Sequence, residues 1–165
     1  MIETKVFLDK LLHLSYEFAI GVPCSYFKDV LVLLEESKEI KYIIATREDE
    51  AVGIATGVNI AKKKVVLFMQ NSGFANIGDA LTSLAQLYKT PMLIFVSYRG
   101  LEADNNFPEH SLMGNVTEPV IKAYNAPYFI LEENNWEKQL VEADKKAEEL
   151  QEPVCLLIKK GVLSR

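Results

Sequence analysis

The fold of this chain is decided by the stretch Val65-Val-Leu-Phe-Met-Gln-Asn-Ser-Gly-Phe-Ala-Asn76. It opens with the apolar run Val65–Gln70, in which apolar residues follow one another instead of alternating with polar ones. Such a run is typical of a strand in a parallel sheet, because helices cover both faces of that sheet. The polar, glycine-containing segment after it predicts a turn into a helix.

Five more apolar runs of this kind recur along the chain, spaced by roughly 25 residues. They are Phe18–Val22, Tyr42–Thr46, Met92–Ser97, Tyr128–Leu131 and Val154–Ile158. Helical spacing of apolar residues fills most of the intervals. The expected helices cover about residues 4–15, the stretch after a Ser25 cap, 51–58, 77–84, and 136–150 after an Asn134 or Asn135 cap. Only Arg99 to Thr117 lacks a period, and we expect an irregular loop there.

Strands that alternate with helices predict an α/β domain with a doubly wound, mostly parallel six-stranded sheet and helices on both faces. A length of 165 residues fits one domain, residues 1–165. The composition of 49% hydrophobic and 25% charged residues excludes a disordered chain. In such folds, the loops at the carboxyl ends of the strands build the ligand site.

Charge and cysteine content narrow the class of protein further. The net charge of −5 gives no electrostatic reason to expect nucleic acid or a membrane as partner. Cys24 and Cys155 lie far apart and match no metal or redox spacing, so we expect buried, reduced thiols. No apolar run approaches the roughly 20 residues of a membrane helix, and the N-terminus does not resemble a signal peptide. We therefore expect a soluble, cytoplasmic protein.

Most familiar catalytic signatures are absent. The sequence has no G-x-G-x-x-G after the first strand, no Walker A loop, no G-x-S-x-G and no H-E-x-x-H. Their absence argues against nicotinamide dehydrogenases, P-loop enzymes and ordinary α/β hydrolases. His13 and His110 are the only histidines, so no metal site is expected.

The run Ala45-Thr-Arg-Glu-Asp-Glu-Ala-Val-Gly-Ile-Ala-Thr-Gly57 places Glu48 where a buried strand ends and a helix begins. Its acidic residues can simply complement the helix dipole, or Glu48 can serve a ligand. Gly53 and Gly57 lower helix propensity, so close approach of another backbone is a reasonable explanation for them. The segment Gln70–Asn76 likewise allows two interpretations, a small-molecule site or an ordinary turn capped by Asn76.

Taken together, these segments resemble a known family, the pyrimidine-binding (PYR-type) domain of thiamine diphosphate-dependent 2-oxoacid decarboxylases. The resemblance lies in Gly21-Val-Pro23, Arg47–Gly57, Gln70–Asn76, Pro91-Met-Leu and Tyr98-Arg-Gly100, in family order. It covers about Gly21 to Leu131. Within the superfamily, the chain is most similar to sulfopyruvate decarboxylase alpha subunits and to phosphonopyruvate decarboxylases.

The resemblance implies thiamine diphosphate as cofactor and Glu48 as the catalytic residue. The Glu48 carboxyl group would hydrogen-bond the N1′ atom of the aminopyrimidine, which requires that the carboxyl group be shielded from water. The residues implied to bind the cofactor are Gly21, Pro23, Glu48, Gln70, Asn71, Ser72, Gly73 and Asn76. Those implied to bind the substrate are Asn71, Ser72, Arg99 and His110. Arg99 could meet a sulfonate or phosphonate, or form only a surface salt bridge, and His110 could have no functional role.

Two departures from the family pattern bear on substrate and partners. Cys24 stands where phosphonopyruvate enzymes commonly carry an acid, which favours sulfopyruvate as the 2-oxoacid substrate, as does Leu112-Met-Gly114. The Gly-Asp-Gly signature that holds diphosphate and Mg²⁺ is missing, since Gly78-Asp79-Ala80 lacks the second glycine. We therefore expect half of an active site, with Mg²⁺ held by a beta subunit in a hetero-oligomer, and self-association of the isolated chain. A phosphonopyruvate or other 2-oxoacid decarboxylase, a non-catalytic binding or regulatory module, and a flavodoxin-like nucleotide binder are the alternatives.

Overall fold

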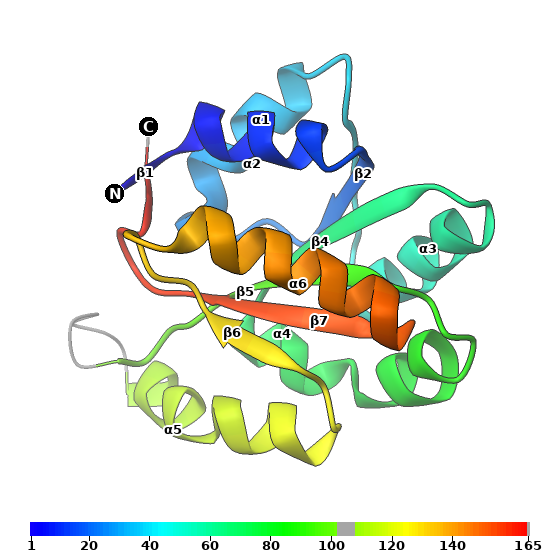
Figure 1. Ribbon diagram of the computed structural model, residues 1–165. Helices are drawn as coiled ribbons and strands as arrows, with labels where there is room; N and C mark the ends of the chain where they lie inside the picture. Colours follow the sequence, from blue (N-terminus) through cyan, green and yellow to red (C-terminus); the bar gives the residue numbers. More distant parts are fainter. Residues whose placement is uncertain (102–107, 165) are drawn as a thin grey trace.

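A six-stranded parallel sheet forms the centre of the computed structural model, which describes residues 1–101 and 108–164 (Figure 1). Its strands are β2 (Tyr16–Gly21), β3 (Lys41–Ile44), β4 (Lys64–Gln70), β5 (Met92–Ser97), β6 (Tyr128–Ile130) and β7 (Pro153–Ile158). They lie in the order β3-β2-β4-β5-β7-β6, and every neighbouring pair is parallel. A short parallel pair, β1 (Ile2–Glu3) and β8 (Leu163–Ser164), lies beside it. All six predicted strands are confirmed, each within two residues of its expected ends.

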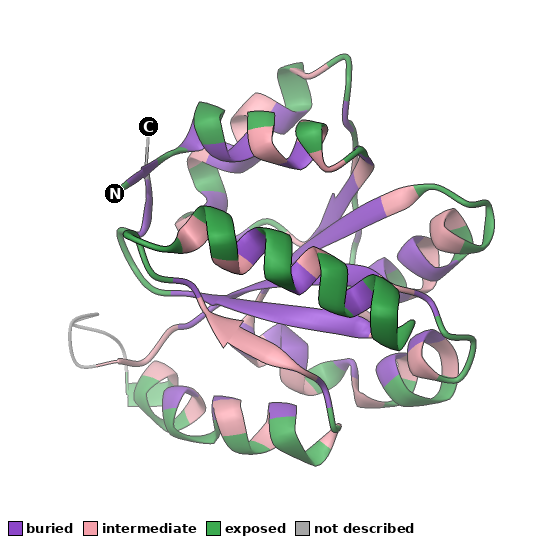
Figure 2. Ribbon diagram, in the orientation of Figure 1, coloured by how far each residue is buried: buried purple, intermediate pink, exposed green. Residues whose placement is uncertain are grey.

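Helices cover both faces of the sheet, as predicted for a doubly wound fold. One face carries α1 (Thr4–His13), the 3₁₀ turn η1 (Ser25–Phe27), α2 (Lys28–Glu36) and α6 (Trp136–Leu150). The other face carries α3 (Glu48–Ile60), α4 (Asn71–Asn76), the π-helix η2 (Ala80–Gln86) and α5 (Pro108–Ala123). Figure 2 shows the central strands buried and the outer faces of the helices exposed.

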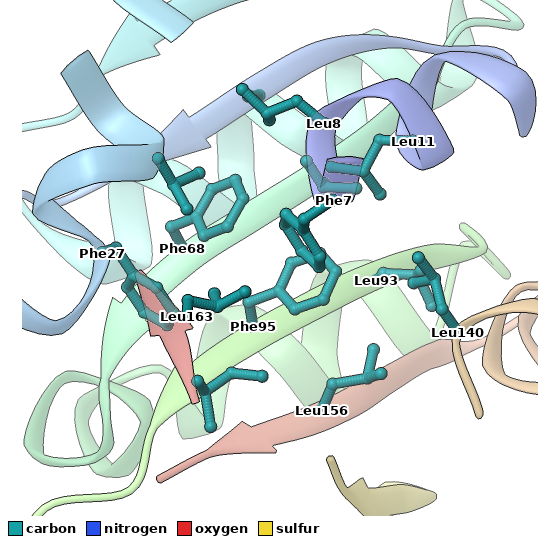
Figure 3. Packing of buried hydrophobic residues seen from close by; sticks show 14 of the residues in the cluster. Phe7, Leu8, Leu11, Phe27, Phe68, Leu93, Phe95, Leu140, Leu156 and Leu163 are labelled. Atoms are coloured by element: carbon teal, nitrogen blue, oxygen red, sulfur yellow. The ribbon is translucent and has the colours of Figure 1, made fainter. Parts of the chain in front are cut away.

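Aromatic rings fill the core on the α1–α2–α6 face. Phe68 and Phe95 stack with ring centroids 5.0 Å apart, and each meets a further ring edge-on, Phe27 and Phe7 respectively, at 5.2 Å (Figure 3). All four side chains are fully buried. Offset and edge-on contacts of this kind add to the free energy gained by burying the rings.

The chain reverses direction across the sheet between β2 and β4. From β2 it runs outward to β3 and then returns to the other side of β2, so β2 and β4 are neighbours. A crevice forms at the carboxyl ends of the strands at such a switch point. The segments at these ends are Gly21–Ser25, after β2, and Gln70–Asn76, after β4. Two of the motifs singled out in the sequence therefore follow the two strands that flank the switch point.

Several local predictions are corrected. The predicted loop from Arg99 to Thr117 is wrong over its second half, because α5 begins at Pro108. Its buried residues are Gly114, Thr117 and Ile121, of which only the last is strongly apolar, so no hydrophobic period marks the helix. Ser25 does not cap α2 but lies in η1, and Leu150 at the end of α6 is exposed. Residues 77–84 form a turn followed by η2 instead of one regular helix.

The expectation of buried, free thiols is confirmed for Cys24 and Cys155. Burial raises the pKa of the Cys155 thiol well above its usual range. Within residues 1–101 and 108–164, no helix is long and apolar enough to span a bilayer.

Candidate active site

Glu48 is the first residue of α3 and lies directly against the backbone of α4. A Cβ atom added at Gly73 would come within 2.3 Å of the Glu48 Oε1 atom and 2.4 Å of its Cδ. No side chain larger than hydrogen fits there without displacing the carboxyl group. The structure thus brings together two residues from separate motifs, and it explains the glycine in the second one. The group that lies closest to Gly73 is the Glu48 side chain.

The three acidic residues in the first turn of α3 have different surroundings. The Glu50 carboxylate accepts a hydrogen bond from the Thr46 amide at 2.7 Å. Asp49 accepts one from the Glu50 amide at 3.0 Å and pairs with Arg47, which lowers the pKa of Asp49. Within the described part of the chain, the half-buried Glu48 carboxylate accepts no hydrogen bond and forms no salt bridge. Asp49 and Glu50 therefore satisfy the helix terminus, and the Glu48 carboxylate stays available to a ligand.

The loop after β2 packs tightly onto β4. A Cβ atom at Gly21 would lie 2.5 Å from the carbonyl oxygen of Phe68, so only glycine fits without a shift of the backbone. Pro23 is exposed, and Cys24 is buried with its Sγ atom 3.2 Å from the Ser97 hydroxyl at the end of β5. A cavity of about 290 Å³ borders this loop, lined by Pro23, Cys24, Ser25, Lys28, Leu31, Val32, Glu35 and Tyr42.

In the segment after β4, most polar side chains contact other parts of the chain. Gln70 donates a hydrogen bond to the Ser72 hydroxyl at 2.9 Å. Asn71 is buried, and its amide nitrogen donates to the carbonyl oxygen of Arg99 at 2.9 Å and to the Thr117 hydroxyl at 2.8 Å. The Asn71 Oδ1 atom is buried without a partner among the described residues. Asn76 is exposed at the end of α4.

Arg99 follows β5 and reaches across to the loop after β2. Its guanidinium donates to the Ser25 hydroxyl, lies 3.7 Å from the Cys24 sulfur, and stacks 4.4 Å from the centre of the Tyr26 ring. His110 lies near the start of α5, where its carbonyl group blocks any Cβ atom at Gly100. The structure therefore places Arg99 beside Cys24 and Ser25, whereas His110 belongs to the helix that packs behind this segment.

Similarity to known proteins fits this arrangement. Residues 3–119 match the family described as "Thiamine pyrophosphate enzyme, N-terminal TPP binding domain". The chain belongs to this family. It is 37% identical over 119 residues to "Sulfopyruvate decarboxylase subunit alpha" of Methanococcus maripaludis, a match that covers 72% of this chain and 71% of that protein.

Other relatives are longer proteins that contain the same domain. A "Phosphonopyruvate decarboxylase" of Streptomyces hygroscopicus is 32% identical over 117 residues, which cover 71% of this chain and 29% of that protein. Among solved structures, benzoylformate decarboxylase from Polynucleobacter necessarius superimposes with a TM-score of 0.76 at 22% identity, over 94% of this chain and 29% of that chain. The structural likeness to benzoylformate decarboxylase concerns the fold alone. The aligned part of this chain corresponds to 29% of that protein and to 29% of the phosphonopyruvate decarboxylase.

The chemistry of the Glu48 carboxyl group fits the aminopyrimidine ring of thiamine pyrophosphate. A carboxylate without a hydrogen-bond partner among the described residues can share a proton with a ring nitrogen, and Gly73 adds no side chain next to it. Within the described residues, no group of three or more His, Cys, Asp and Glu side chains could hold a metal ion. The residues in hand thus fit the organic ring of the cofactor better than the Mg²⁺ that accompanies its diphosphate.

Sequence reasoning missed two contributors to this edge. Thr117 holds the Asn71 amide, and Ser97 holds the Cys24 thiol. Neither has a distinctive sequence signal: Ser97 is a single polar residue that ends an apolar run, and Thr117 lies in a stretch without apolar periodicity. Gly53 and Gly57 were expected to face another backbone, but a Cβ atom at either would meet nothing within 4 Å. Among the described residues, no other backbone therefore approaches Gly53 or Gly57.

Proposed function

We propose that the chain is the alpha subunit of a thiamine diphosphate-dependent decarboxylase that converts 3-sulfopyruvate to sulfoacetaldehyde and CO2. The observation that carries the proposal is the Glu48 carboxylate, which has no partner in the described chain and lies against Gly73. Sequence identity of 37% to a protein named as the sulfopyruvate decarboxylase alpha subunit supports the substrate. It also supports a partner, because that name describes one subunit of a larger enzyme.

In this proposal, Glu48 holds and shares a proton with the N1′ atom of the bound aminopyrimidine. When bound, thiamine diphosphate supplies the electron sink that accepts the electron pair released by loss of CO2. Position and environment of the carboxyl group come from this chain, through the end of β3 and the start of α3. Because the Glu48 side chain is only half-buried in the isolated chain, the cofactor and a second subunit must complete its shielding from water.

The partner is a beta subunit that carries the diphosphate- and Mg²⁺-binding half of the site. The absence of a Gly-Asp-Gly signature from the sequence supports this division, as does the absence of a metal-binding cluster within the described residues. Gly21, Pro23, Gln70, Ser72 and Asn76 remain the predicted cofactor contacts of this chain. Asn71, whose amide nitrogen is used inside the chain, can offer a ligand only its Oδ1 atom.

The test is co-expression with the candidate beta subunit, followed by decarboxylation assays with sulfopyruvate, phosphonopyruvate and pyruvate. We expect sulfopyruvate to give the highest kcat/KM, and Glu48→Gln to reduce turnover by about 10²- to 10⁴-fold with an unchanged Tm. Asp49→Asn is the matched control, because it removes a neighbouring carboxylate that already has partners.

Other outcomes would select the alternatives. A preference for phosphonopyruvate or pyruvate would assign a different 2-oxoacid. An assembled pair that binds thiamine diphosphate but turns over none of the three would favour a non-catalytic module. Full activity of Glu48→Gln would contradict the catalytic role of Glu48. Tight binding of thiamine diphosphate with Mg²⁺ and turnover of sulfopyruvate by this chain without any partner would contradict the assignment of half a site.

A further inference from the structure

Arg99, Cys24, Ser25 and Tyr26 form a compact group at the carboxyl ends of β2 and β5, here called the arginine cluster. The Arg99 guanidinium stacks 4.4 Å from the Tyr26 ring centre, donates to the Ser25 hydroxyl and contacts the Cys24 sulfur at 3.7 Å. Stacking on an aromatic face suits a planar guanidinium and fixes its plane. The cluster therefore presents a cation of defined orientation beside the crevice at the switch point.

The backbone of Arg99 is as firmly held as its side chain. Its carbonyl group accepts a 2.9 Å hydrogen bond from Asn71, whose other contact is the Thr117 hydroxyl of α5. At the next residue, Gly100, φ is +91° and the backbone lies against α5, where a Cβ atom would collide with the carbonyl group of His110. Since both ends of the residue are anchored, the guanidinium does not have to be ordered when a ligand arrives, and preorganised groups bind ligands with a smaller entropic cost.

No carboxylate neutralises this guanidinium within the described residues. Arg47, the other arginine in that part of the chain, pairs with Asp49 through two hydrogen bonds of 3.0 Å. Among the described residues, the Arg99 side chain contacts Cys24, Ser25 and Tyr26, which are neutral, and its Nε atom is buried without an acceptor there. A charged group with an unused donor at a strand end is a feature that calls for an anionic partner.

We propose that the arginine cluster binds the distal sulfonate of the substrate and thereby determines specificity for sulfopyruvate; this inference rests on the proposed function. A sulfonate carries one negative charge near neutral pH, which one guanidinium balances. A phosphonate carries between one and two, as phosphate monoesters do, and would be left partly uncompensated among the neutral Ser25, Cys24 and Tyr26. Three oxygens on sulfur also match the fork of guanidinium donors and the hydroxyl beside it.

The first measurement is substrate preference of the assembled enzyme with Arg99→Gln. A hydrogen-bonded charge pair is worth about 10- to 100-fold in affinity, so KM for sulfopyruvate should rise by about that factor. The kcat/KM for pyruvate, which lacks a distal anion, should stay within about threefold. Arg99→Lys keeps the positive charge but not the forked arrangement of donors, so its KM for sulfopyruvate should lie between those of the wild type and Arg99→Gln. This variant also provides a second test in case Arg99→Gln fails to assemble. Lys28→Gln is the matched control, since Lys28 is a second cation that lines the cavity beside Cys24 and Ser25.

The second measurement is independent of turnover. Isothermal titration of the assembled protein with 3-sulfopropanoate, 3-phosphonopropanoate and propanoate should rank the sulfonate as the tightest of the three. Arg99→Gln should remove that ranking, and Lys28→Gln should leave it intact. Tighter binding of the phosphonate, or loss of the ranking in Lys28→Gln alone, would overturn the inference.

Failure of the inference and failure of the proposed function are distinguishable. If the wild-type pair decarboxylates sulfopyruvate but Arg99→Gln slows sulfopyruvate and pyruvate equally, or neither, the arginine cluster is not the sulfonate site. If the wild-type pair decarboxylates none of the three acids while 3-sulfopropanoate still binds in an Arg99-dependent manner, the proposed reaction fails and the anion site stands.

Discussion

Glu48 and Glu118 are two carboxylates on the same face of the sheet, and their surroundings are opposite. Glu118 of α5 accepts hydrogen bonds from the Tyr98 hydroxyl at 3.1 Å and the Tyr128 hydroxyl at 2.5 Å, and it lies 3.9 Å from the Lys122 ammonium group. The bond from Tyr128, joined by that from Tyr98, holds the pKa of Glu118 below its usual range. Glu48 has none of these partners within the described chain, and a glycine lies beside it.

The difference separates two uses of a carboxylate. Glu118 connects α5 to β5 and β6, so its charge contributes to the stability of the fold. Among the described residues, Glu48 has no hydrogen bond or salt bridge that would give its charge a comparable structural role. A carboxylate that the fold leaves unsatisfied, in a place that the fold keeps clear, is the expected signature of a ligand contact. Substitutions at Gly73, Glu118 and Tyr98 each change one of these two carboxylates or its surroundings.

Among substitutions that keep both carboxylates, the largest effect is expected from Gly73→Ala. The new Cβ atom would lie 2.3–2.4 Å from the Glu48 carboxyl group, which must rotate away because it is the flexible end of a side chain. Displacing a catalytic group by about 1 Å costs about 10²-fold in turnover. Assays of the assembled enzyme should show this loss while thermal unfolding of the chain shows no loss of stability.

A double-mutant cycle gives the control. In a Glu48→Ala background there is no carboxyl group to displace, so Gly73→Ala should lower the residual turnover no further. An equal loss in both backgrounds would mean that Gly73 acts on something other than Glu48.

The next effect concerns stability. Glu118→Gln removes the charge from two hydrogen bonds, which should lower the free energy of unfolding by about 1–2 kcal/mol, measured by urea denaturation at pH 7. Turnover per assembled enzyme should change by less than about threefold. A strong loss of kcat at full stability would mean that Glu118 takes part in the reaction, and the comparison with Glu48 would collapse.

The sequence determines the strands and the site edge well, for a simple reason. Strands such as Met92–Ser97 are buried on both faces, and their uninterrupted apolar residues indicate that burial in the sequence. The sequence places the motifs of Glu48 and Gly73 at the carboxyl ends of β3 and β4, which flank β2 in the sheet, but it could not predict the contact between the two residues. What failed was α5, because its inward residues Gly114 and Thr117 are small or polar and leave no apolar period.

The arginine cluster was only half predictable. The sequence left open whether Arg99 meets an anion or forms only a surface salt bridge. Its contacts to Tyr26 and Ser25 join segments more than 70 residues apart, so they depend on which loops meet in the fold. Ser25 appeared to be a helix cap because serine favours that position, and in the structure its hydroxyl accepts from Arg99 instead. The capping propensity of serine reflects its neighbours in the sequence. The hydrogen bond from Arg99 comes from a segment distant in the sequence, so this propensity could not predict it.

A smaller change in stability is expected when the hydrogen bond between Tyr98 and Glu118 is removed. Burial, followed by the hydrogen bond to Glu118, raises the pKa of Tyr98 to about 12, and the same carboxylate raises the pKa of Tyr128. A raised folded-state pKa contributes stability that is complete below the unfolded value near 10 and is lost as pH rises through about 12. Glu118 affects stability at acidic pH. Its lowered pKa contributes stability above about pH 4, and this contribution is lost on further acidification.

Tyr98→Phe should therefore cost about 1 kcal/mol at pH 7 and flatten the loss of stability between pH 10 and 12. Chemical denaturation at a series of pH values measures both. Tyr88→Phe, at an exposed tyrosine, is the control and should change neither quantity. An unaltered alkaline limb in Tyr98→Phe would show that other groups produce it.

The smallest effect is expected at Gly53, on the exposed side of α3. A Cβ atom there meets nothing within 4 Å, so Gly53→Ala adds only helix propensity and should stabilise the isolated chain by about 0.5–1 kcal/mol. The same methyl group should weaken association with the beta subunit, or of the chain with itself, if another backbone packs on Gly53 and Gly57 as the sequence predicts. Sedimentation velocity of the mixed subunits measures association separately from stability. Gly161→Ala is a contrasting variant: its added Cβ atom also meets nothing within 4 Å, but the positive φ of this residue makes the substitution strained. A chain that gains stability and assembles normally would show that the glycines of α3 leave space that no partner fills.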